Sequence, residues 1–358
     1  MISLNDHSDQ AAPWEVPVRV AVVGLGYWGP NIVRNFYENP HAEVVRICDA
    51  RPDRLNVLQT RYPGIPRTTR FEDLLEDRSI EAIAIATPVS THYQLALQAL
   101  KAGKHVFVEK PIASSSSEAR ELVELSEEKR LVLMPGHTFL YSPPVNMIRS
   151  LIEAGDLGEI YFISTSRVNL GLHQSDVSVA WDLGPHDFSI LRYLLDESPD
   201  HVTALSRACV IPGTPDVAFI NLEFPSGAIA HVELSWLAPS KLRRTTIVGS
   251  RKMVVYDDTS NEPIRVFDSG ASLPNPETFG EYKMTYRTGD ILSPRVEVAE
   301  PLDLELSDFC ESIRSKRQPR SSARLGYEVV RIVEAVDASL EQNGIRVPVG
   351  GPAPFAAV

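Results

Sequence analysis

Short runs of consecutive apolar residues alternate with amphipathic stretches over the first 140 residues of the chain. The runs cover 18–26, 43–49, 81–88, 105–113 and 131–137, and helix-like stretches lie between them at 31–38, 92–103 and 114–130. Apolar runs without a polar face are typical of strands that helices bury on both sides, as in a parallel sheet. We therefore predict a doubly wound parallel sheet, which binds its ligand at the carboxyl ends of its strands. Ser115 and Glu118 have the spacing of a capping box at the start of the last of these helices.

After about residue 140 the pattern changes to long strands with little helix between them. A helix (143–155), a strand (157–169) and a helix near 186 precede strand-like segments at 201–210, 216–224, 227–238, 244–258 and 264–268. In 227–238 one set of alternate side chains is small or apolar: Ala228, Ala230, Val232, Leu234 and Trp236. This alternation predicts a large open, mainly antiparallel sheet with one covered face and one more polar face.

The rest of the chain contains fewer strand signals. Residues 268–301 are rich in Gly, Pro, Ser and Thr and are predicted to form a long loop, and helices at 302–317 and 323–344 close the chain. The uncovered face of the predicted sheet also indicates an interface between identical chains.

A length of 358 residues is enough for two domains. We predict a polar, mobile tail over 1–16, a nucleotide-binding domain over 17–139 and an α/β substrate-binding and oligomerisation domain over 140–350. The tail lacks the basic and apolar regions of a signal peptide. No stretch of about 18 uncharged apolar residues occurs, so we predict no membrane-spanning segment.

The first apolar run ends in a glycine-rich turn. Gly24, Gly26 and Gly29 have the GxGxxG spacing between a predicted strand and a predicted helix, and Asp49 follows the next strand. In this context the glycines allow a tight turn, a close approach to a pyrophosphate and close packing of the helix, and the acid binds the adenosine ribose. Asp49 would also repel a 2′-phosphate, so the pattern favours NAD, although Arg51 leaves NADP open.

Other polar or aromatic residues lie where the predicted sheet binds its ligand. Thr87, Glu109, Lys110 and His137 follow the carboxyl ends of strands. Tyr27 and Trp28, inside the glycine turn, either cover the pyrophosphate or pack against the protein.

A second candidate constellation surrounds the sequence WDLGPHDF. Asp182 and His186 are four residues apart, on one side of a predicted helix start, and Pro185 fits a first turn. The positive potential of a helix N-terminus disfavours a protonated histidine, which would leave His186 able to accept a proton. Asp182 could cap the helix, orient a substrate or orient His186. A lysine such as Lys110 stabilises a developing alkoxide, so the three residues suit oxidation of an alcohol by NAD.

Charge and cysteine content narrow the functional classes. The net charge of −12 argues against a nucleic-acid partner, and it leaves open whether an acidic cleft attracts a cationic substrate. The three cysteines, Cys48, Cys209 and Cys310, are far apart and form no CxxC pair. This predicts no disulfide framework and no metal site, and it suits a cytoplasmic protein.

These motifs together resemble the Gfo/Idh/MocA family, the glucose-fructose oxidoreductase and inositol dehydrogenase family. The resemblance rests on VAVVGLGYWG, ATPVSTHY, KAGKHVFVEKPIA, the D-x-x-x-H of WDLGPHD and the closing helix, and it covers nearly the whole chain after the tail. It implies a Rossmann domain followed by an α/β domain with a large open sheet, joined into homodimers or homotetramers. It implies that Lys110 contacts the nicotinamide and the substrate hydroxyl, and that Asp182 and His186 line the substrate pocket, with His186 as acid/base. Thr87, Pro88 and His92 match a T-P-x-x-x-H segment under the nicotinamide half of the cofactor.

Further residues are expected near the pocket. His137 and Tyr141 follow the last strand of the parallel sheet, and Tyr286 with Arg287 could reach the site from the predicted long loop.

The leading functional hypothesis is an NAD-dependent oxidoreductase that interconverts a secondary hydroxyl and a ketone at C3 of a hexopyranosyl unit. The substrate would be a nucleotide sugar or an amino-sugar glycoside such as an aminoglycoside. One alternative is an inositol or polyol dehydrogenase. Another, of a different class, is a non-enzymatic regulator that binds a dinucleotide without turnover.

Overall fold

The computed structural model describes residues 16–171, 173, 177–272 and 285–350. All of the predicted mobile tail except Val16 lies outside these residues. The chain divides into two compact units: unit 1 comprises Met1–Ile112, Arg120–Gly136 and Leu302–Ala323, and unit 2 comprises Ala113–Ala119, His137–Pro301 and Arg324–Val358.

Unit 1 is built on a parallel sheet of the order β3-β2-β1-β4-β5-β6. Its strands are β1 (Val18–Val23), β2 (Ala42–Cys48), β3 (Arg67–Thr68), β4 (Ala82–Ile85), β5 (His105–Glu109) and β6 (Leu133–Gly136). Every neighbouring pair is parallel, and β1, β4 and most of β5 are buried. The predicted doubly wound parallel sheet is therefore confirmed.

Helices connect these strands. They are α1 (Gly29–Glu38), α2 (Pro52–Arg61), α3 (Glu72–Glu76), α4 (Val89–Lys101) and α5 (Ser116–Lys129). Three of them, α1, α4 and α5, lie at or near the predicted positions, whereas α2 and α3 were not predicted. The backbone N–H of Glu118 donates to the Ser115 hydroxyl at 3.3 Å, as the capping box predicts. Gly103 ends α4 with a φ of +78°, a conformation that side chains disfavour.

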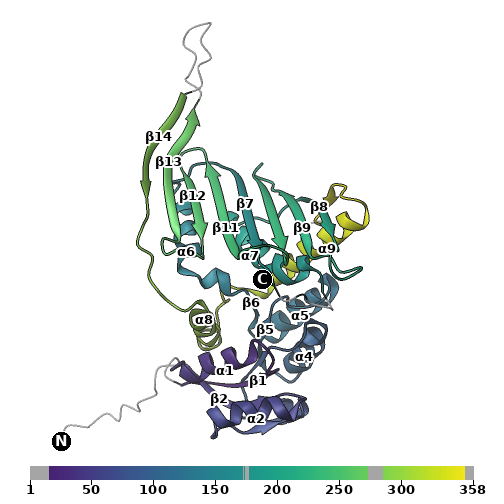
Figure 1. Ribbon diagram of the computed structural model, residues 1–358. Coiled ribbons are helices and arrows are strands. Elements are labelled where there is room, and N and C mark those ends of the chain that lie inside the picture. Colours follow the sequence, from purple (N-terminus) through teal and green to yellow (C-terminus); the bar gives the residue numbers. More distant parts are fainter. Residues whose placement is uncertain (1–15, 172, 174–176, 273–284, 351–358) are drawn as a thin grey trace, which may run out of the picture. The chain divides into compact units, whose positions relative to one another are not determined.

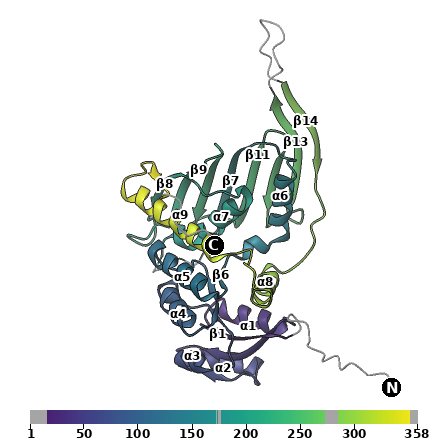
Figure 2. The ribbon, with the colours of Figure 1, turned by 180° about the vertical axis from the view of Figure 1, so that it is seen from behind.

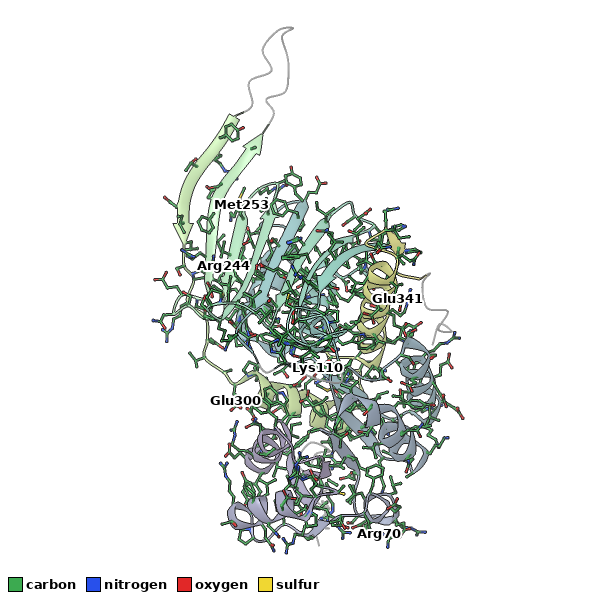
Figure 3. The ribbon with its side chains drawn as sticks, turned by 45° about the vertical axis from the view of Figure 1, so that its right-hand side comes forward. Arg70, Lys110, Arg244, Met253, Glu300 and Glu341 are labelled. Atoms are coloured by element: carbon green, nitrogen blue, oxygen red, sulfur yellow. The ribbon has the colours of Figure 1, made fainter. Side chains whose placement is uncertain are left out.

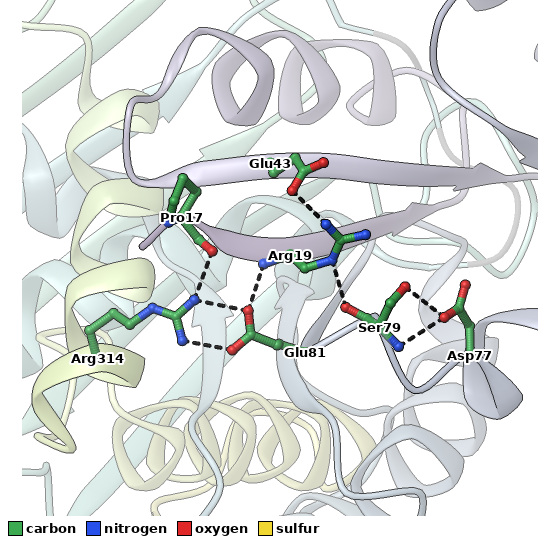
Figure 4. A network of polar contacts seen from close by, with 7 residues as sticks. All are labelled: Pro17, Arg19, Glu43, Asp77, Ser79, Glu81 and Arg314. Carbon is green, nitrogen blue, oxygen red and sulfur yellow. Dashed lines mark hydrogen bonds and ion pairs between the residues drawn. The ribbon is translucent and has the colours of Figure 1, made fainter. Parts of the chain in front are cut away.

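One closing helix belongs to unit 1, which differs from the predicted domain ranges. In α8 (Pro301–Ser315) the guanidinium of Arg314 donates to both carboxylate oxygens of Glu81, at 2.6 and 2.8 Å (Figure 4). Phe309 on the same helix contacts the rings of Phe36 and Phe107 in unit 1, at 6.3 and 6.0 Å between centroids. The apolar face of α8 is buried within unit 1, which only the packing of distant residues decides.

Unit 2 contains a nine-stranded sheet of the order β14-β13-β12-β11-β7-β10-β9-β8-β15. The strands are β7 (Ile160–Val168), β8 (His201–Arg207), β9 (Val217–Glu223), β10 (Ile229–Ser235), β11 (Leu242–Gly249), β12 (Met253–Asp257), β13 (Ile264–Ser272), β14 (Thr285–Leu292) and β15 (Val347–Pro348). Only the β7–β10 pair is parallel among these, so the prediction of a mainly antiparallel sheet is confirmed.

Helices cover one face of this sheet, as Figure 2 shows. They are α6 (Pro143–Glu153), α7 (Val179–Leu195) and α9 (Ala323–Glu341), and a 3₁₀ helix, η1 (Thr138–Tyr141), packs with α6 and α7. The predicted alternation holds in β10, where Ala230, Val232 and Leu234 are at most 2% exposed and Ile229 is 56% exposed. Ser235 belongs to the same set of alternate side chains as Ile229 but is buried, because it lies at the end of the strand.

The predicted long loop over 268–301 is wrong for part of its length. β13 continues to Ser272, and β14 pairs with it in antiparallel register, forming two strands that extend beyond the rest of the sheet (Figure 1). Ladder hydrogen bonds join backbone groups, so residues typical of turns can still form strands at an exposed sheet edge. Residues 273–284 lie outside the described part of the chain.

The sequence analysis also predicts no membrane-spanning segment and no disulfide framework. Within the described residues no helix is both long enough and apolar enough to cross a bilayer. All three cysteines are free, and burial raises the pKa of Cys48 and Cys310 to about 12, which keeps both thiols protonated.

Candidate functional site

The glycine turn of unit 1 has the shape of a dinucleotide cradle. Gly24 has a φ of +88°, and a Cβ added there would lie 2.6 Å from the backbone of Ala86. A Cβ on Gly29 would lie 2.0 Å from the carbonyl oxygen of Gly24, so no side chain fits where α1 meets the turn. At Gly26 a Cβ would be in van der Waals contact with Nη1 of Arg54, at 3.6 Å, and with no other heavy atom outside its chain neighbours within 4 Å. The residues therefore fit the pyrophosphate of a bound NAD.

Asp49 lies directly after β2, at the edge where the ribose is expected. Its Oδ2 accepts the backbone N–H of Leu25 at 2.7 Å, and its Oδ1 accepts the N–H of Arg51 at 2.8 Å. The side chain therefore connects the glycine turn to the end of β2, with 5% of the residue exposed. The guanidinium of Arg51 forms an exposed ion pair with Asp53 at 2.7 Å.

The two aromatic residues of the turn are exposed. Tyr27 is 80% exposed and Trp28 is 46% exposed, with their rings edge to face at 5.7 Å. Within unit 1 neither is part of the core, which removes the packing alternative for Tyr27. Contact with a pyrophosphate stays a prediction for both.

The T-P-x-x-x-H and E-K-P segments are joined by one histidine. The Nε2 of His92 is 2.8 Å from the carbonyl oxygen of Thr87, and its Nδ1 is 2.8 Å from the carbonyl oxygen of Pro111. Pro88 precedes α4 as its N-cap. Burial lowers the pKa of His92, and a neutral ring has one N–H to donate to one carbonyl at a time. His92 thus holds together the two segments that carry predicted cofactor residues.

Lys110, which Figure 3 labels, follows the carboxyl end of β5, and the pKa of the preceding residue, Glu109, is perturbed. Removal of Glu109 from water raises its pKa to about 7, and the positive charge of Lys110 partly offsets that effect. The backbone N–H of Lys110 donates to Oε2 of Glu109 at 3.2 Å. Perturbed carboxyl groups are concentrated at functional sites, which supports a role for this segment.

In unit 2, Asp182 and His186 lie on α7, but not at its start. The helix begins at Val179 with Ser178 as N-cap, so Asp182 is its fourth residue and does not cap it. Pro185 lies inside the helix, because the apolar residues before Asp182 extend it backward onto the core. The helix potential falls off within the first turn, so our argument that the N-terminus keeps His186 neutral is wrong.

A buried tryptophan positions Asp182. The indole Nε1 of Trp236, which follows β10, donates to Oδ2 of Asp182 at 3.1 Å. Trp236 is 1% exposed, and its backbone N–H donates to the carbonyl oxygen of Asp216 at 2.9 Å. The ring of His173 packs against Trp236 at 5.3 Å, and its Nε2 is 3.8 Å from Oδ2 of Asp216. These contacts identify Trp236, His173 and Asp216 as site candidates that the sequence analysis missed.

His186 is held by an aromatic ring from η1. Phe139 meets the imidazole edge to face at 5.1 Å, and the guanidinium of Arg167 lies 4.4 Å from the centre of the same ring. Arg167 on β7 also forms a buried ion pair with Asp187 at 2.6 Å, which connects α7 to the sheet beside His186. No sequence signal identifies Phe139 or Arg167, because each contacts a residue of α7 that lies far from it in the chain.

The remaining predicted substrate residues lie in two places in unit 2. His137 and Tyr141 flank η1 and are 1% and 2% exposed, so they lie inside the unit near α7. Tyr286 is on β14, 75% exposed, and β14 is four strands away from β7 in the sheet. At about 4.8 Å per strand that separation is roughly 19 Å, so unit 2 does not bring Tyr286 or the adjacent Arg287 to Asp182 and His186.

Lys110 belongs to unit 1, whereas Asp182 and His186 belong to unit 2. That these three residues act together on one substrate therefore stays a prediction.

Replacing Trp236 by Phe is expected to lower kcat, because the indole hydrogen bond that orients the Asp182 carboxylate is lost. One hydrogen bond to a charged group corresponds to about 1.5–3 kcal/mol, so we expect a fall on the order of tenfold to a hundredfold, with NADH binding unchanged. Trp181→Phe is the matched control, because its indole donates to Asp337 at 2.6 Å. Equal losses in both variants would show that the effect is structural.

Comparison with known proteins gives a consistent result for both units. Residues 18–137 match the model described as oxidoreductase family, NAD-binding Rossmann fold, and residues 145–255 match the GFO/IDH/MocA C-terminal domain. scyllo-Inositol 2-dehydrogenase (NAD(+)) of Bacillus subtilis is 27% identical over 321 residues, covering 85% of this chain and 89% of the relative. UDP-N-acetylglucosamine 3-dehydrogenase of Acidithiobacillus ferrooxidans is 24% identical over 309 residues, covering 84% and 94%.

A solved structure extends the likeness to almost the whole chain. GenD2 from gentamicin A biosynthesis, in complex with NAD, superposes with a TM-score of 0.79 at 22% identity, covering 98% of this chain and 100% of GenD2. At this identity the superposition shows the shared fold.

Proposed function

This chain belongs to the Gfo/Idh/MocA oxidoreductase family and has its NAD-binding Rossmann domain, and from this premise we propose that it oxidises a secondary hydroxyl on a sugar ring. The proposed position is C3 of a hexopyranosyl unit, carried by a nucleotide sugar or by an amino-sugar glycoside. The observation that carries the proposal is that Asp182, held by Trp236, lies one turn before His186 on α7, in a chain that also keeps Lys110 beside the Rossmann sheet.

The relatives support the choice of substrate class. A 3-dehydrogenase of UDP-N-acetylglucosamine and a dehydrogenase of scyllo-inositol both match this chain over more than four fifths of its length. Both names describe oxidation of a ring hydroxyl. A Rossmann fold alone supports many reactions, so the substrate argument depends on these relatives and on the side chains of α7.

Each residue has a distinct role in the proposed reaction. The glycine turn of Gly24, Gly26 and Gly29 would hold NAD, which would supply the acceptor for the hydride of the carbinol carbon. His186 accepts the hydroxyl proton as the O–H bond breaks and the ketone forms. Lys110 donates a hydrogen bond to the oxygen and stabilises its developing negative charge. Asp182, whose Oδ2 is engaged by the indole of Trp236, presents its other oxygen to orient the substrate.

An inositol or polyol dehydrogenase is the second candidate, and the Bacillus subtilis relative favours it. It would use the same chemistry and differ only in the residues that contact the rest of the substrate.

The test is NADH formation with a panel of nucleotide sugars, free hexoses, aminoglycosides and inositols. We expect turnover with a glycoside, and a product that has lost two hydrogen atoms, with the ketone located at C3 by NMR. Turnover restricted to inositols would establish the second candidate. NAD binding without turnover on any member of the panel would contradict the proposal and favour a dinucleotide-binding regulator.

We also propose that the uncovered face of the nine-stranded sheet joins two copies of this chain. Exposed apolar side chains of that face form two cross-strand pairs, Phe162 with Ile229 on β7 and β10 and Leu205 with Phe219 on β8 and β9. A row that contains Asn221 and His231 lies between the two pairs. A patch of this kind can pair with itself about a two-fold axis, because each copy presents the same residues.

Lysine at both Phe219 and Ile229 is expected to shift the chain from oligomer to monomer, because two charges would be buried per copy. Light scattering coupled to gel filtration measures the mass. Val57→Lys, on the exposed face of α2 and 73% exposed, is the control for an added charge. An unchanged mass in the double variant would place the interface elsewhere.

A further inference from the structure

Two arginines of unit 2 are neighbours on the helix-covered face of the nine-stranded sheet. Arg167 on β7 and Arg243 on β11 are direct partners in the antiparallel ladder. Arg243 belongs to the same set of alternate side chains as Ile247, which is part of the core of unit 2. Like charges directly opposite each other on neighbouring strands repel, so the two guanidinium groups need compensation by negative charge.

One aromatic ring of η1 connects both cations with the proposed base. The guanidinium carbons of Arg167 and Arg243 lie 4.4 and 5.8 Å from the centre of the Phe139 ring. The imidazole of His186 meets the same ring at 5.1 Å, so a single phenyl ring separates it from the guanidinium of Arg243. A pyranose ring has about the width of a phenyl ring. A sugar whose hydroxyl lies at His186 can therefore place another group of its ring at Arg243.

The carboxylates beside the two arginines leave donors unused. Arg167 donates from Nε and Nη2 to Asp187, at 2.6 and 3.4 Å, and its Nη1 is buried with no acceptor among the described residues. Nη1 of Arg243 donates to Oδ2 of Asp258 at 3.2 Å. An arginine carries five N–H donors, and a buried donor without an acceptor is rare in folded proteins. The arrangement therefore lacks acceptor oxygens.

Arg243 is the arginine of this pair that a ligand can reach. Its side chain is 36% exposed, whereas that of Arg167 is 7% exposed. Among the described residues Asp258 engages one nitrogen of the Arg243 fork, so the other nitrogens can donate to a ligand. A planar guanidinium matches the paired oxygens of a carboxylate or a phosphate. The unused donors thus fit an anionic group.

We propose that Arg243, with Arg167 beside it, forms a subsite for an anionic group of the substrate, a phosphate or a carboxylate carried by the sugar. The inference rests on the proposed function in that His186 faces the reacting hydroxyl. It narrows the proposed substrate to an acidic glycoside, such as a sugar phosphate, a nucleotide sugar or a uronic acid. It argues against an aminoglycoside, whose ammonium groups the two arginines would repel.

The experiment is isothermal titration calorimetry of the full chain, with NADH added to occupy the glycine turn. The probes are glucose 1-phosphate, glucuronate, glucosamine and the uncharged methyl glucoside. We expect at least one acidic probe to bind about tenfold to a hundredfold more tightly than methyl glucoside, the difference that one charge-assisted hydrogen bond supplies. Tighter binding of glucose 1-phosphate would identify a phosphate as the recognised group, and tighter binding of glucuronate would identify a carboxylate.

Arg243→Ala should lower the affinity for the preferred acidic probe to that for methyl glucoside, whose own affinity should change by less than about threefold. Arg243→Gln should give the same result, because its amide still donates to Asp258 but carries no charge. Agreement of the two variants separates the lost charge from any loss of folding, which thermal melting measures. Arg243→Lys should keep part of the preference, because an ammonium group supplies the charge without the fork.

Arg244→Ala is the matched control. Arg244 is the next residue on β11, so its side chain points to the opposite face of the sheet, where it pairs with Asp257 at 2.9 Å. The affinities of this variant for all four probes should equal those of the wild type.

Several results would overturn the inference. They are equal wild-type affinities for acidic and uncharged probes, tighter binding of glucosamine than of methyl glucoside, and a preference for acidic probes that persists in Arg243→Ala. Equal losses for methyl glucoside and the acidic probes in Arg243→Ala and Arg243→Gln would show a structural effect and would also contradict the subsite.

These outcomes separate the inference from the proposed function, because binding is measured without turnover. A preference for acidic probes that depends on Arg243, without NADH formation on any sugar, would overturn only the proposed function. NADH formation on uncharged glycosides, without such a preference, would overturn only the inference.

Discussion

Lys110→Ala and His186→Asn are each expected to lower the rate of NADH formation on the best sugar substrate by a factor on the order of 10²–10⁴, the usual contribution of a positioned acid or base. In the proposed reaction, Lys110 stabilises charge on the reacting oxygen, and His186 accepts the proton of the same hydroxyl. Because both act on the same hydroxyl, the double variant should lose little more than the worse single variant. Steady-state kinetics gives kcat, and NADH titration gives cofactor affinity, which should be retained.

Two controls separate chemistry from folding in that experiment. Lys101→Ala removes an exposed lysine at the end of α4, and His41→Asn removes a histidine before β2. Both variants should turn over at the wild-type rate. A Lys110→Ala, His186→Asn double variant that also kept the wild-type rate would refute the assigned mechanism.

Gly29→Ala is expected to abolish measurable dinucleotide binding and to destabilise unit 1. The added Cβ would lie 2.0 Å from the carbonyl oxygen of Gly24, and this carbonyl belongs to backbone that cannot move without opening the glycine turn. Overpacking of this kind costs roughly 1–3 kcal/mol of unfolding free energy. NADH titration and thermal melting are the measurements.

Gly64→Ala is the matched control for that change. A Cβ on Gly64 would have no atom within 4 Å, so the variant should bind NADH and melt as the wild type does. Normal NADH affinity in Gly29→Ala would contradict the assignment of the cradle.

The cofactor half of the site was predictable residue by residue. Gly24, Gly29 and Asp49 lie within one strand-turn-helix-strand segment, and their roles depend on local backbone geometry that the motif spacing specifies. The sequence did not indicate which arginine lies beside Asp49. Arg51 is nearer to Asp49 in sequence, but its side chain points to Asp53, and only the direction of α2 brings Arg54 back toward Gly26.

For the residues expected to bind the substrate, the sequence predicted the helix that carries Asp182 and His186 but not the residues that contact them. The D-x-x-x-H spacing placed Asp182 and His186 on one helix, yet the helix starts earlier than Pro185 suggested, because burial of Val179 and Ala180 outweighs a proline inside the helix. Their partners Trp236 and Phe139 come from elements that no pattern connects with α7.

The sequence by itself determined most of the strands and helices, the class of each sheet, the glycine cradle and the family to which the chain belongs. These depend on the periodicity of apolar residues and on contacts between near neighbours. Only the tertiary structure decided that α8 packs on the first sheet, that the indole of Trp236 holds Asp182, and that Arg54 faces the glycine turn. The reason is physical: side-chain direction and the pairing of residues far apart in the chain depend on how the elements pack, and packing is a property of the whole fold.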